Sequence, residues 1–410
     1  MLHSLRTDKE IYLDHAATTP MSAKVLEVVS KHMQEDYANP SSMHFLGRRA
    51  KSVLENSRLD LATILRVMPE EVVYTGSGTE SNNLAILGVA RANKRNGKHI
   101  IISAIEHKAV LAPASILEKE GFTITKIPVT EQGIVDTHVL KNSLRPETLL
   151  VSIMLANNEI GTIQPVKEVV DIVKNHRKNT GNLCFVHTDA CQAMGLLPVY
   201  PKDLGVDLLS INGSKIYGPK GIGVLYIKKG IKISPVIFGG SQELGLRAGT
   251  ENIAIAVGMS EAVKDVDDFR LAESARLSVI QGQCFFLLKK NIPNLIINGD
   301  MTKRLVNNVH ICIPNIEGES LVLLLDRWGI STATGSACSS RDLEPSHVLK
   351  AIGRNDDIIH GSLRLSFGRS TTLEDVHLAV FHITEAVKLL TSMTATTTNI
   401  VTGRIYEKNT

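Results

Sequence analysis

The sequence predicts an α/β protein whose large domain is a mostly parallel, seven-stranded sheet flanked by helices. Short apolar runs alternate with amphipathic stretches along the chain, and this rhythm is typical of β-α-β units. The length of 410 residues allows two or three domains. Aromatic residues make up only 4% of the chain, so a core of this size must consist mainly of aliphatic side chains.

The expected strands and helices follow one another in order. The strands fall at residues 72–74, 99–103, 122–129, 149–155, 183–188, 206–211 and 224–227, and the helices at 79–95, 108–120 and 166–176. Each strand is a short apolar run bounded by polar or glycine-containing segments. Because parallel sheets bind ligands at the carboxyl ends of their strands, the loops after these runs are the places to look for a site.

The pattern changes near residue 254. A long helix over about 255–290 precedes short strands at 307–312 and 362–366 and a last helix over about 373–390. We therefore expect a large domain over residues 15–258 and a small α/β domain formed by residues 1–14 and 259–390. The threonine-rich tail, residues 391–410, has no periodicity and is expected to be flexible.

The charge balance and the cysteines exclude several classes of protein. The chain has 45 Lys and Arg against 42 Asp and Glu, a net charge of +3, which is too small for the basic footprint of a nucleic-acid-binding protein. Five cysteines are too few, and odd in number, for a disulfide framework. No apolar run is long enough to span a membrane, and the N-terminus lacks the apolar core of a signal peptide. We expect a cytoplasmic protein in a reducing compartment.

The first candidate site follows the first of these strands. The segment Thr75-Gly76-Ser77-Gly78-Thr79 joins a strand to a helix through small residues, so its backbone amides can approach an anion at the start of the helix. Thr79 adds a hydroxyl donor. The segment lacks the lysine of a P-loop, and its simpler interpretation is a helix cap made by Ser77 or Thr79.

Asp189 ends another expected strand, where a buried carboxylate needs a partner. It could pair with a cationic atom of a ligand, or it could cap a helix. A metal site made by Cys184, His187 and Cys191 is disfavoured, because strand alternation directs Cys184 to the face opposite His187.

Lys215 follows the expected strand at residues 206–211 and stands among small and apolar residues. A lysine partly removed from water loses its proton more readily, as Schiff-base chemistry requires, although a surface role is the commoner one for a lysine. Together, the anion loop, Asp189 and Lys215 match the needs of pyridoxal phosphate, whose enzymes use a lysine and an acidic partner for the ring nitrogen.

Further polar residues stand where they could join such a site. His107 could stack on a flat ring, although a lone histidine is more often structural, and Asn157 could contact the phenolic oxygen of the ring. Arg364 is a charge inside a strand pattern, suited to a carboxylate ligand or to a structural ion pair. Cys338 lies in a loop of glycine and serine, where an accessible thiolate could act as a nucleophile; an incidental loop cysteine is the alternative.

In this order and spacing, these residues resemble the cysteine desulfurases of the NifS/IscS type, which are class V, fold-type I PLP-dependent transferases. The matching motifs lie at residues 12–20, 39–42, 79–83, 106–107, 157–161, 187–189, 215–221, 247–252 and 335–338. The resemblance covers about residues 11–390. It implies the α/β fold of that family, pyridoxal 5′-phosphate (PLP) as cofactor and L-cysteine as substrate.

The resemblance also assigns the cofactor ligands. Lys215 would hold PLP covalently, Asp189 would pair with the ring nitrogen, and His107 would stack on the ring and move protons. The remaining ligands of the ring and the phosphate that it implies are Gln192, Asn157, Gly78, Thr79, Asn212, Ser214 and Thr250. Thr250 would reach the phosphate of a neighbouring subunit, which implies a homodimer with shared active sites.

On the substrate side, the resemblance implies that Arg364, helped by Asn39, binds the carboxylate of L-cysteine. Cys338 would take the sulfur as a persulfide, leaving alanine. A protein such as a scaffold or a sulfurtransferase would then accept the sulfur for iron–sulfur clusters, thiolated tRNA or sulfur-modified DNA. Neither a metal nor direct contact with nucleic acid is expected.

Two positions depart from the family pattern. Ser214 stands where members usually have histidine, and Asn212 stands where many have serine. Both side chains can still donate hydrogen bonds, so cofactor binding is expected to survive with altered affinity or proton handling. A selenocysteine lyase, or a non-catalytic scaffold of the same fold, is the alternative function.

Overall fold

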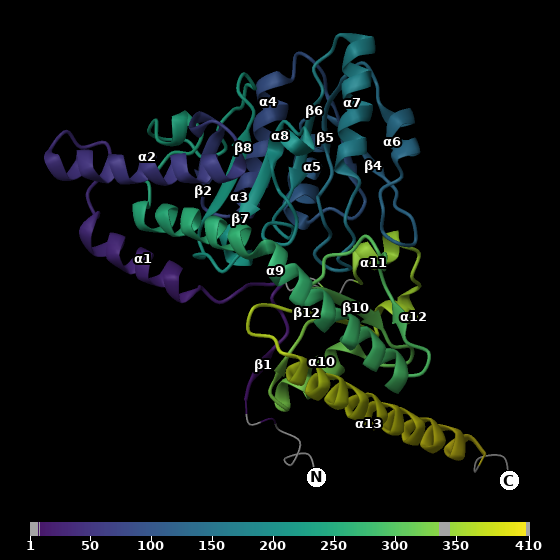
Figure 1. Cartoon of the computed structure of the whole chain (residues 1–410). Coiled ribbons are helices and arrows are strands. Elements are labelled where there is room, and N and C mark those ends of the chain that lie inside the picture. The colour runs from purple at the N-terminus through teal and green to yellow at the C-terminus, as the bar shows by residue number, and fades with distance from the viewer. Residues whose placement is uncertain (1–6, 8, 336–344, 407–410) are drawn as a thin grey trace.

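The computed structural model describes residues 7, 9–335 and 345–406, and it contains the predicted large sheet (Figure 1). The strands lie in the order β2 (Val72–Thr75), β8 (Gly223–Ile227), β7 (Leu208–Asn212), β6 (Phe185–Asp189), β5 (Thr148–Ser152), β3 (His99–Ser103) and β4 (Thr123–Ile127). β8 runs antiparallel to its neighbours β2 and β7, and the remaining pairs are parallel. The prediction of a mostly parallel seven-stranded sheet is confirmed.

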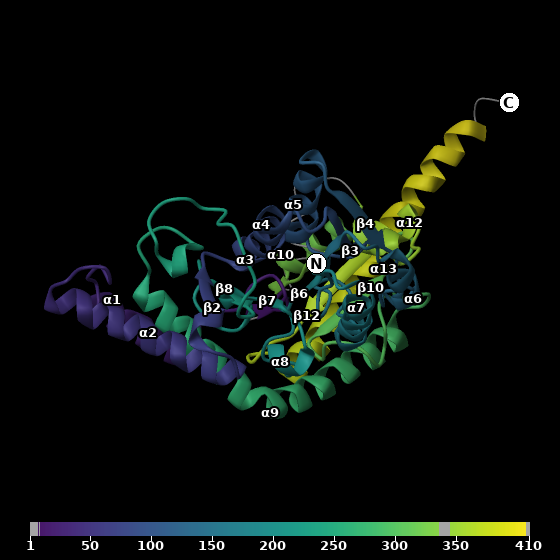
Figure 2. The same ribbon diagram turned by 90° about the horizontal axis from the view of Figure 1, so that it is seen from above.

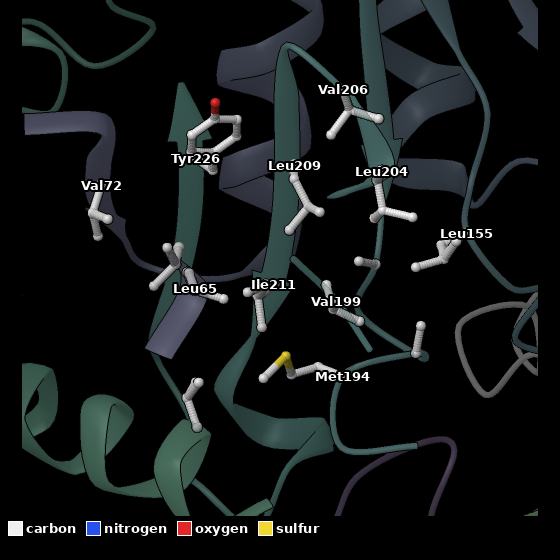
Figure 3. Close-up of a cluster of buried hydrophobic side chains, with 14 of the residues drawn as sticks. Leu65, Val72, Leu155, Met194, Val199, Leu204, Val206, Leu209, Ile211 and Tyr226 are labelled. Carbon is white, nitrogen blue, oxygen red and sulfur yellow. The ribbon is translucent and has the colours of Figure 1, made fainter. Parts of the chain in front are cut away.

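Helices cover both faces of this sheet. One core includes α2 (Phe45–Leu65), α7 (Val166–Thr180) and the first part of α9 (Ile253–Asn291), and the other includes α5 (Lys108–Lys119). Leu208 of β7 belongs to the core that includes α5, whereas Leu209 and Ile211 belong to the core that includes α2, where Figure 3 shows them with Leu65 and Tyr226. A strand buried on both faces has an unbroken apolar sequence, which is why these strands were predictable. The domain also contains α1 (Ala23–Glu35), α6 (Thr137–Ser143) and α8 (Pro201–Leu204).

The helix after β2 contains one irregular turn. It begins as α3 (Gly78–Asn83), continues as a π-helical turn over Leu84–Gly88 and ends as α4 (Val89–Asn93). The sequence pattern predicts a single helix over 79–95, so its extent is nearly right and the π turn is the difference. A π turn hydrogen-bonds to the fifth residue along the chain instead of the fourth, and such turns are frequent at functional sites.

α9 connects the large domain to a smaller α/β domain. Its antiparallel sheet has the order β12 (Ser362–Ser366), β10 (Asn308–Cys312) and β9 (Ile296–Ile297). Its helices are α10 (Gly318–Arg327), α11 (His347–Ala351), α12 (Asp356–Ile359) and α13 (Leu373–Tyr406). The N-terminal segment joins this domain, because β1 (Ile11–Tyr12) pairs with β11 (Ile330–Ser331) and Leu13 is buried in its core. Among the described residues, no helix is both long and apolar enough to cross a membrane.

Two helical regions differ from the prediction. α13 continues to Tyr406, into the tail for which the sequence predicts no regular structure. A helix extends from an existing turn far more easily than it nucleates, so a threonine-rich stretch can prolong a helix that begins elsewhere. The sequence pattern does not predict α1 or α2, which lie at one end of the molecule while α13 extends from the other (Figure 2).

Candidate active site

A cavity of about 150 Å³ lies at the carboxyl ends of β3, β5, β6 and β7. Residues that follow these strands line it from the large domain, and Arg364 of β12 lines it from the small domain. Eight side chains or backbone positions predicted for the site line it: Gly78, Thr79, His107, Asp189, Gln192, Asn212, Lys215 and Arg364. The parallel sheet therefore gathers the predicted residues at one edge, as the position of ligands in such folds requires.

Lys215 ends a short 3₁₀ turn, Gly213–Lys215, that directly follows β7. Its Nζ donates hydrogen bonds to the carbonyl oxygens of Ala16, at 2.9 Å, and Ala17. Gln192 donates from Nε2 to the same Ala16 carbonyl at 3.0 Å. The ammonium group is therefore held at the cavity by backbone oxygens of the N-terminal segment.

The Asp189 carboxylate stands at the end of β6 and is only 7% exposed. Oδ2 accepts a hydrogen bond from Nδ2 of Asn82 at 2.6 Å, and Oδ1 accepts one from the backbone N–H of Cys191 at 2.9 Å. Asn82 is buried and also lines the cavity. Sequence reasoning assigned no role to Asn82, although it lies four residues after Gly78 and so on the same face of that helix.

The predicted anion loop is closely packed against neighbouring loops at Gly78. A Cβ atom on Gly78 would lie 2.8 Å from Sγ of Cys191 and 3.0 Å from Cβ of Asn212, so only glycine fits there without a shift. Ser77 caps the helix by accepting a hydrogen bond from the N–H of Glu80 at 3.1 Å. The cap is therefore made by Ser77, while Gly78 and Thr79 line the cavity, where an anion site remains a prediction.

His107 begins α5 and lines the cavity beside a buried acid. Its Nδ1 accepts a hydrogen bond from the N–H of Ala109 at 3.1 Å, which leaves Nε2 as the protonated nitrogen of a neutral ring. The preceding residue, Glu106, is fully buried, and its Oε1 accepts hydrogen bonds from Ser103 Oγ and the N–H of Met154. Burial raises the pKa of Glu106 to about 8, so this carboxyl group is largely protonated at neutral pH.

Arg364 lies in the middle of β12, and its guanidinium is almost fully buried. Nη2 donates to Oδ1 of Asp14 at 2.7 Å, and Nη1 donates to the carbonyl oxygen of Asn158 at 2.9 Å. The structural ion pair is present, and Arg364 also lines the cavity, where its role as a carboxylate ligand stays a prediction. Asp14 was not among the predicted site residues.

Four predicted residues are not brought to this cavity within one chain. The buried Asn157 amide is occupied by the backbone: Nδ2 donates to the carbonyl of Ile105, and Oδ1 accepts from the N–H groups of Glu159 and Ile160. Asn39 lies between α1 and α2. Ser214 joins the 3₁₀ turn, and Thr250 lines a separate cavity of about 230 Å³.

Cys338 lies outside the described residues. The chain on either side of it comes close to the carboxylate of Glu159, which follows the cavity-lining Asn158. Ser346 donates from Oγ to Oε2 of Glu159 at 2.6 Å, and a Cβ atom on Gly335 would lie 3.2 Å from the same oxygen. Gly335 and Ser346, which are described residues on either side of this segment, thus both lie at Glu159, next to the cavity-lining Asn158.

The residues of this cavity fit PLP. The cofactor needs an amine for its aldehyde, an acid for its ring nitrogen and donors for its phosphate. The Lys215 amine, the buried Asp189 carboxylate and, at the start of α3, Gly78 and the Thr79 hydroxyl all line the cavity and would meet these three needs. The hydrogen bond from Asn82 fixes the orientation of the Asp189 carboxylate.

Comparison with known proteins adds independent support. The aminotransferase class-V family model matches residues 11–378. The chain is 47% identical to the cysteine desulfurase IscS of Dictyoglomus turgidum, covering 90% of this chain and 92% of that protein. It is 46% identical to the IscS of Methanosarcina thermophila, covering 95% of both chains.

Solved structures give the same result. A structure titled NifS-like protein aligns with a TM-score of 0.87 and 35% identity, covering 93% of this chain and 100% of that one. The NifS-like protein of Rickettsia africae aligns with a TM-score of 0.83 and 31% identity over 92% of this chain and 99% of that one. Sequence and fold thus both match IscS and NifS-like proteins over nearly the whole chain.

Proposed function

Because this chain belongs to the aminotransferase class-V family and is a PLP-dependent cysteine desulfurase, we propose that its cavity takes sulfur from L-cysteine and transfers it to Cys338. The observation that carries the proposal is the convergence of Lys215, Asp189 and Gly78 on one cavity that Arg364 lines from the opposite domain. A lysine, an acid and an anion loop are the parts that hold PLP, and a buried arginine suits a substrate carboxylate.

Each residue has a separate task in this proposal. When bound, PLP supplies an electron sink for the α-carbon of an amino acid. Lys215 would hold the cofactor through Nζ and move the α-proton of the substrate. Asp189 would keep a proton on the ring nitrogen, since a buried carboxylate stabilises an adjacent cation. His107 would stack on the ring, and Gln192 and Asn212 would hydrogen-bond the cofactor from the ends of their strands.

The sulfur transfer needs a thiolate on Cys338, because the thiolate is the nucleophile. Its Sγ would attack the substrate sulfur and form an S–S bond. The bond between that sulfur and the substrate carbon would break, and its electron pair would stay on the carbon, which takes up a proton to give alanine. The approach of the flanking residues Gly335 and Ser346 to Glu159 supports this assignment.

The decisive experiment measures alanine and persulfide formed from L-cysteine by the wild type and by Cys338→Ala. The variant is expected to lose turnover while it still binds PLP, because the cofactor residues lie on other loops. Ser339→Ala, which changes the neighbouring position of the same segment, serves as the matched control and should keep its activity. If Cys338→Ala releases alanine from L-cysteine at the wild-type rate, Cys338 is not the sulfur acceptor.

We further propose a homodimer in which Thr250 reaches the phosphate site of the other subunit. Large apolar side chains are exposed between α1 and α2, where Tyr37 is 73% and Met43 is 83% exposed. Phe238, in the segment that leads to Thr250, is 79% exposed. Exposed apolar groups of this size are typical of protein interfaces, and Thr250 itself is exposed to solvent in one chain.

Mixed dimers test the shared site. A chain with Lys215→Ala is combined with a chain with Thr250→Ala, and each homodimer is measured separately. If Thr250 acts across the interface, one site of the mixed dimer keeps both wild-type residues, and activity returns to about half of the wild-type value. An absence of recovery would place Thr250 outside the partner's site.

For the fate of the sulfur, we propose a protein acceptor in a reducing, cytoplasmic compartment. The net charge of +3 gives no basic footprint for direct contact with nucleic acid, and a persulfide on Cys338 would be lost under oxidising conditions. Labelled sulfur from cysteine should therefore appear on a protein that co-purifies with this chain. Transfer of the label straight to tRNA or DNA in the purified system would contradict this proposal.

A further inference from the structure

Residues 14–17, which we call the junction segment, touch both sides of the cavity. On one side, Oδ1 of Asp14 accepts a hydrogen bond from Nη2 of Arg364 at 2.7 Å. On the other side, the carbonyls of Ala16 and Ala17 accept the hydrogen bonds of Lys215 Nζ. The expected binder of the substrate carboxylate and the expected cofactor lysine are thus attached to the same four residues.

Asp14 contacts Arg364 but is not itself part of the cavity lining. Arg364 and Asn158 line the cavity, whereas Asp14 does not. The Asp14 side chain is 17% exposed and that of Arg364 only 2%, so the ion pair is largely removed from water. Asp14 therefore holds the guanidinium from a position outside the lining of the cavity.

The junction segment is itself fixed to β12, the strand that carries Arg364. Asp14 forms a β-bridge with Ser366, and Oγ of Ser366 accepts a hydrogen bond from the N–H of Ala16 at 2.8 Å. The N–H of Ser366 donates to the carbonyl of Leu13 at 2.7 Å. Asp14 is thus fixed to β12 at Ser366, two residues from Arg364, and has little freedom to move relative to that strand.

We propose that Asp14 is a positioning residue that sets the orientation of Arg364. This inference rests on the proposed function, in which Arg364 binds the carboxylate of L-cysteine.

Arginine loses considerable side-chain freedom when it is held in one rotamer. Asp14 and the Asn158 carbonyl hold one donor of each terminal nitrogen before the substrate arrives. Substrate binding then does not have to order the side chain, which is the general benefit of preorganisation.

The test compares Asp14→Asn with Asp375→Asn in the PLP-loaded enzyme. Asp375 pairs with Lys9 at 2.7 Å, so it also joins the N-terminal segment to the small domain, but it does not touch Arg364. We expect Asp14→Asn to raise KM for L-cysteine by about tenfold, the value of one charge-assisted hydrogen bond, and to change kcat little. Asp375→Asn should leave KM unchanged.

Direct binding separates orientation of Arg364 from a general loss of structure. Calorimetry is performed with 3-mercaptopropionate, which has the carboxylate and thiol of the substrate but no amine, and with cysteamine, which has the amine and thiol but no carboxylate. Asp14→Asn should weaken 3-mercaptopropionate by about tenfold and leave cysteamine unchanged. Asp14→Glu, which keeps the charge, should recover part of the lost affinity.

Four results would overturn the inference. Tighter binding of 3-mercaptopropionate by Asp14→Asn would mean that Asp14 competes with the substrate for Arg364. Equal weakening of both ligands would mean that Asp14 only supports the fold. If Arg364→Lys weakens the binding of 3-mercaptopropionate and Asp14→Asn does not, Asp14 has no part in orienting Arg364. If Arg364→Lys has no effect, Arg364 does not bind the substrate carboxylate, and that part of the proposed function is wrong.

Discussion

On the large-domain side of the cavity, Asp189, His107 and Lys215 each stand at or just beyond the end of a strand of the same parallel sheet. On the small-domain side, Arg364 lies in the middle of β12 and is oriented by Asp14, 350 residues earlier in the sequence. The large-domain side is therefore built by local rules, in which a strand end delivers one side chain. The small-domain side depends on a long-range contact between the N-terminal segment and a distant strand.

The difference shows on which side of the site a residue keeps its position when its neighbours are substituted. A residue that follows its own strand keeps its place as long as the sheet forms. A guanidinium held by a partner from another part of the chain loses its orientation when either member of the pair changes, because a buried charge without its partner is strongly destabilising. Substitutions on the two sides should therefore differ in kind as well as in size.

The largest effect is expected from Lys215→Ala on the large-domain side. Turnover of L-cysteine should fall by about a thousandfold or more, since the amine both holds the cofactor and moves the proton. The wild type should absorb at about 390–420 nm, as a lysine-bound cofactor does, whereas any PLP in the variant is bound only non-covalently. Mass spectrometry after borohydride reduction should find no cofactor on the variant and one on the wild type at residue 215.

Lys220→Ala is the matched control for this prediction. Lys220 is exposed, lies five residues further along the chain and is not part of the cavity. Its loss should leave absorbance and turnover near the wild-type values. A wild type with an unmodified lysine at 215 after reduction would refute the assignment.

A smaller effect is expected from Arg364→Lys on the small-domain side. Lysine keeps the charge but lacks the planar fork, so it cannot bind Asp14, the Asn158 carbonyl and a carboxylate together. KM for L-cysteine should rise by about a hundredfold while cofactor absorbance stays normal, because the cofactor residues belong to the other side. Arg354→Lys, in the small domain but outside the cavity, is the control and should change neither KM nor absorbance. An unchanged KM in Arg364→Lys would mean that the small-domain side of the cavity does not bind the substrate carboxylate.

The smallest effect concerns Glu106, whose pKa is raised from 4.5 to about 8 by burial. Between pH 4.5 and 8 the folded chain retains a proton that the unfolded chain has released, so this group lowers stability as pH rises through that window. Glu106→Gln mimics the protonated acid. Its stability relative to the wild type should grow with pH by at most about 1.4 kcal/mol per pH unit.

Urea unfolding at pH 5, 6, 7 and 8 checks the prediction for Glu106. Glu118→Gln on α5 changes an exposed glutamate of the same region and should show a constant difference from the wild type. A constant difference for Glu106→Gln as well would mean that Glu106 is ionised in the folded chain.

Most of the large domain could be predicted because its strands are buried on both faces and their polar neighbours mark the strand ends. Lys215, Asp189 and Gly78 follow from that rule alone. Asn82 and Asp14 were missed because their partners are set by tertiary contacts, not by spacing. Asn157 obeys the strand-end rule and still turns to backbone groups, since a buried amide takes the nearest donors and acceptors.

The π-helical turn Leu84–Gly88 makes the number of residues in this helix more important than the identity of its side chains. Each residue of an α-helix turns the chain by about 100°. Deleting one residue within the turn could restore regular α-helix there, but it would rotate Gly78 and Asn82 by about that angle relative to α4. Point substitutions in this turn should therefore be tolerated in evolution more readily than single-residue insertions or deletions, which would move the whole anion loop at once.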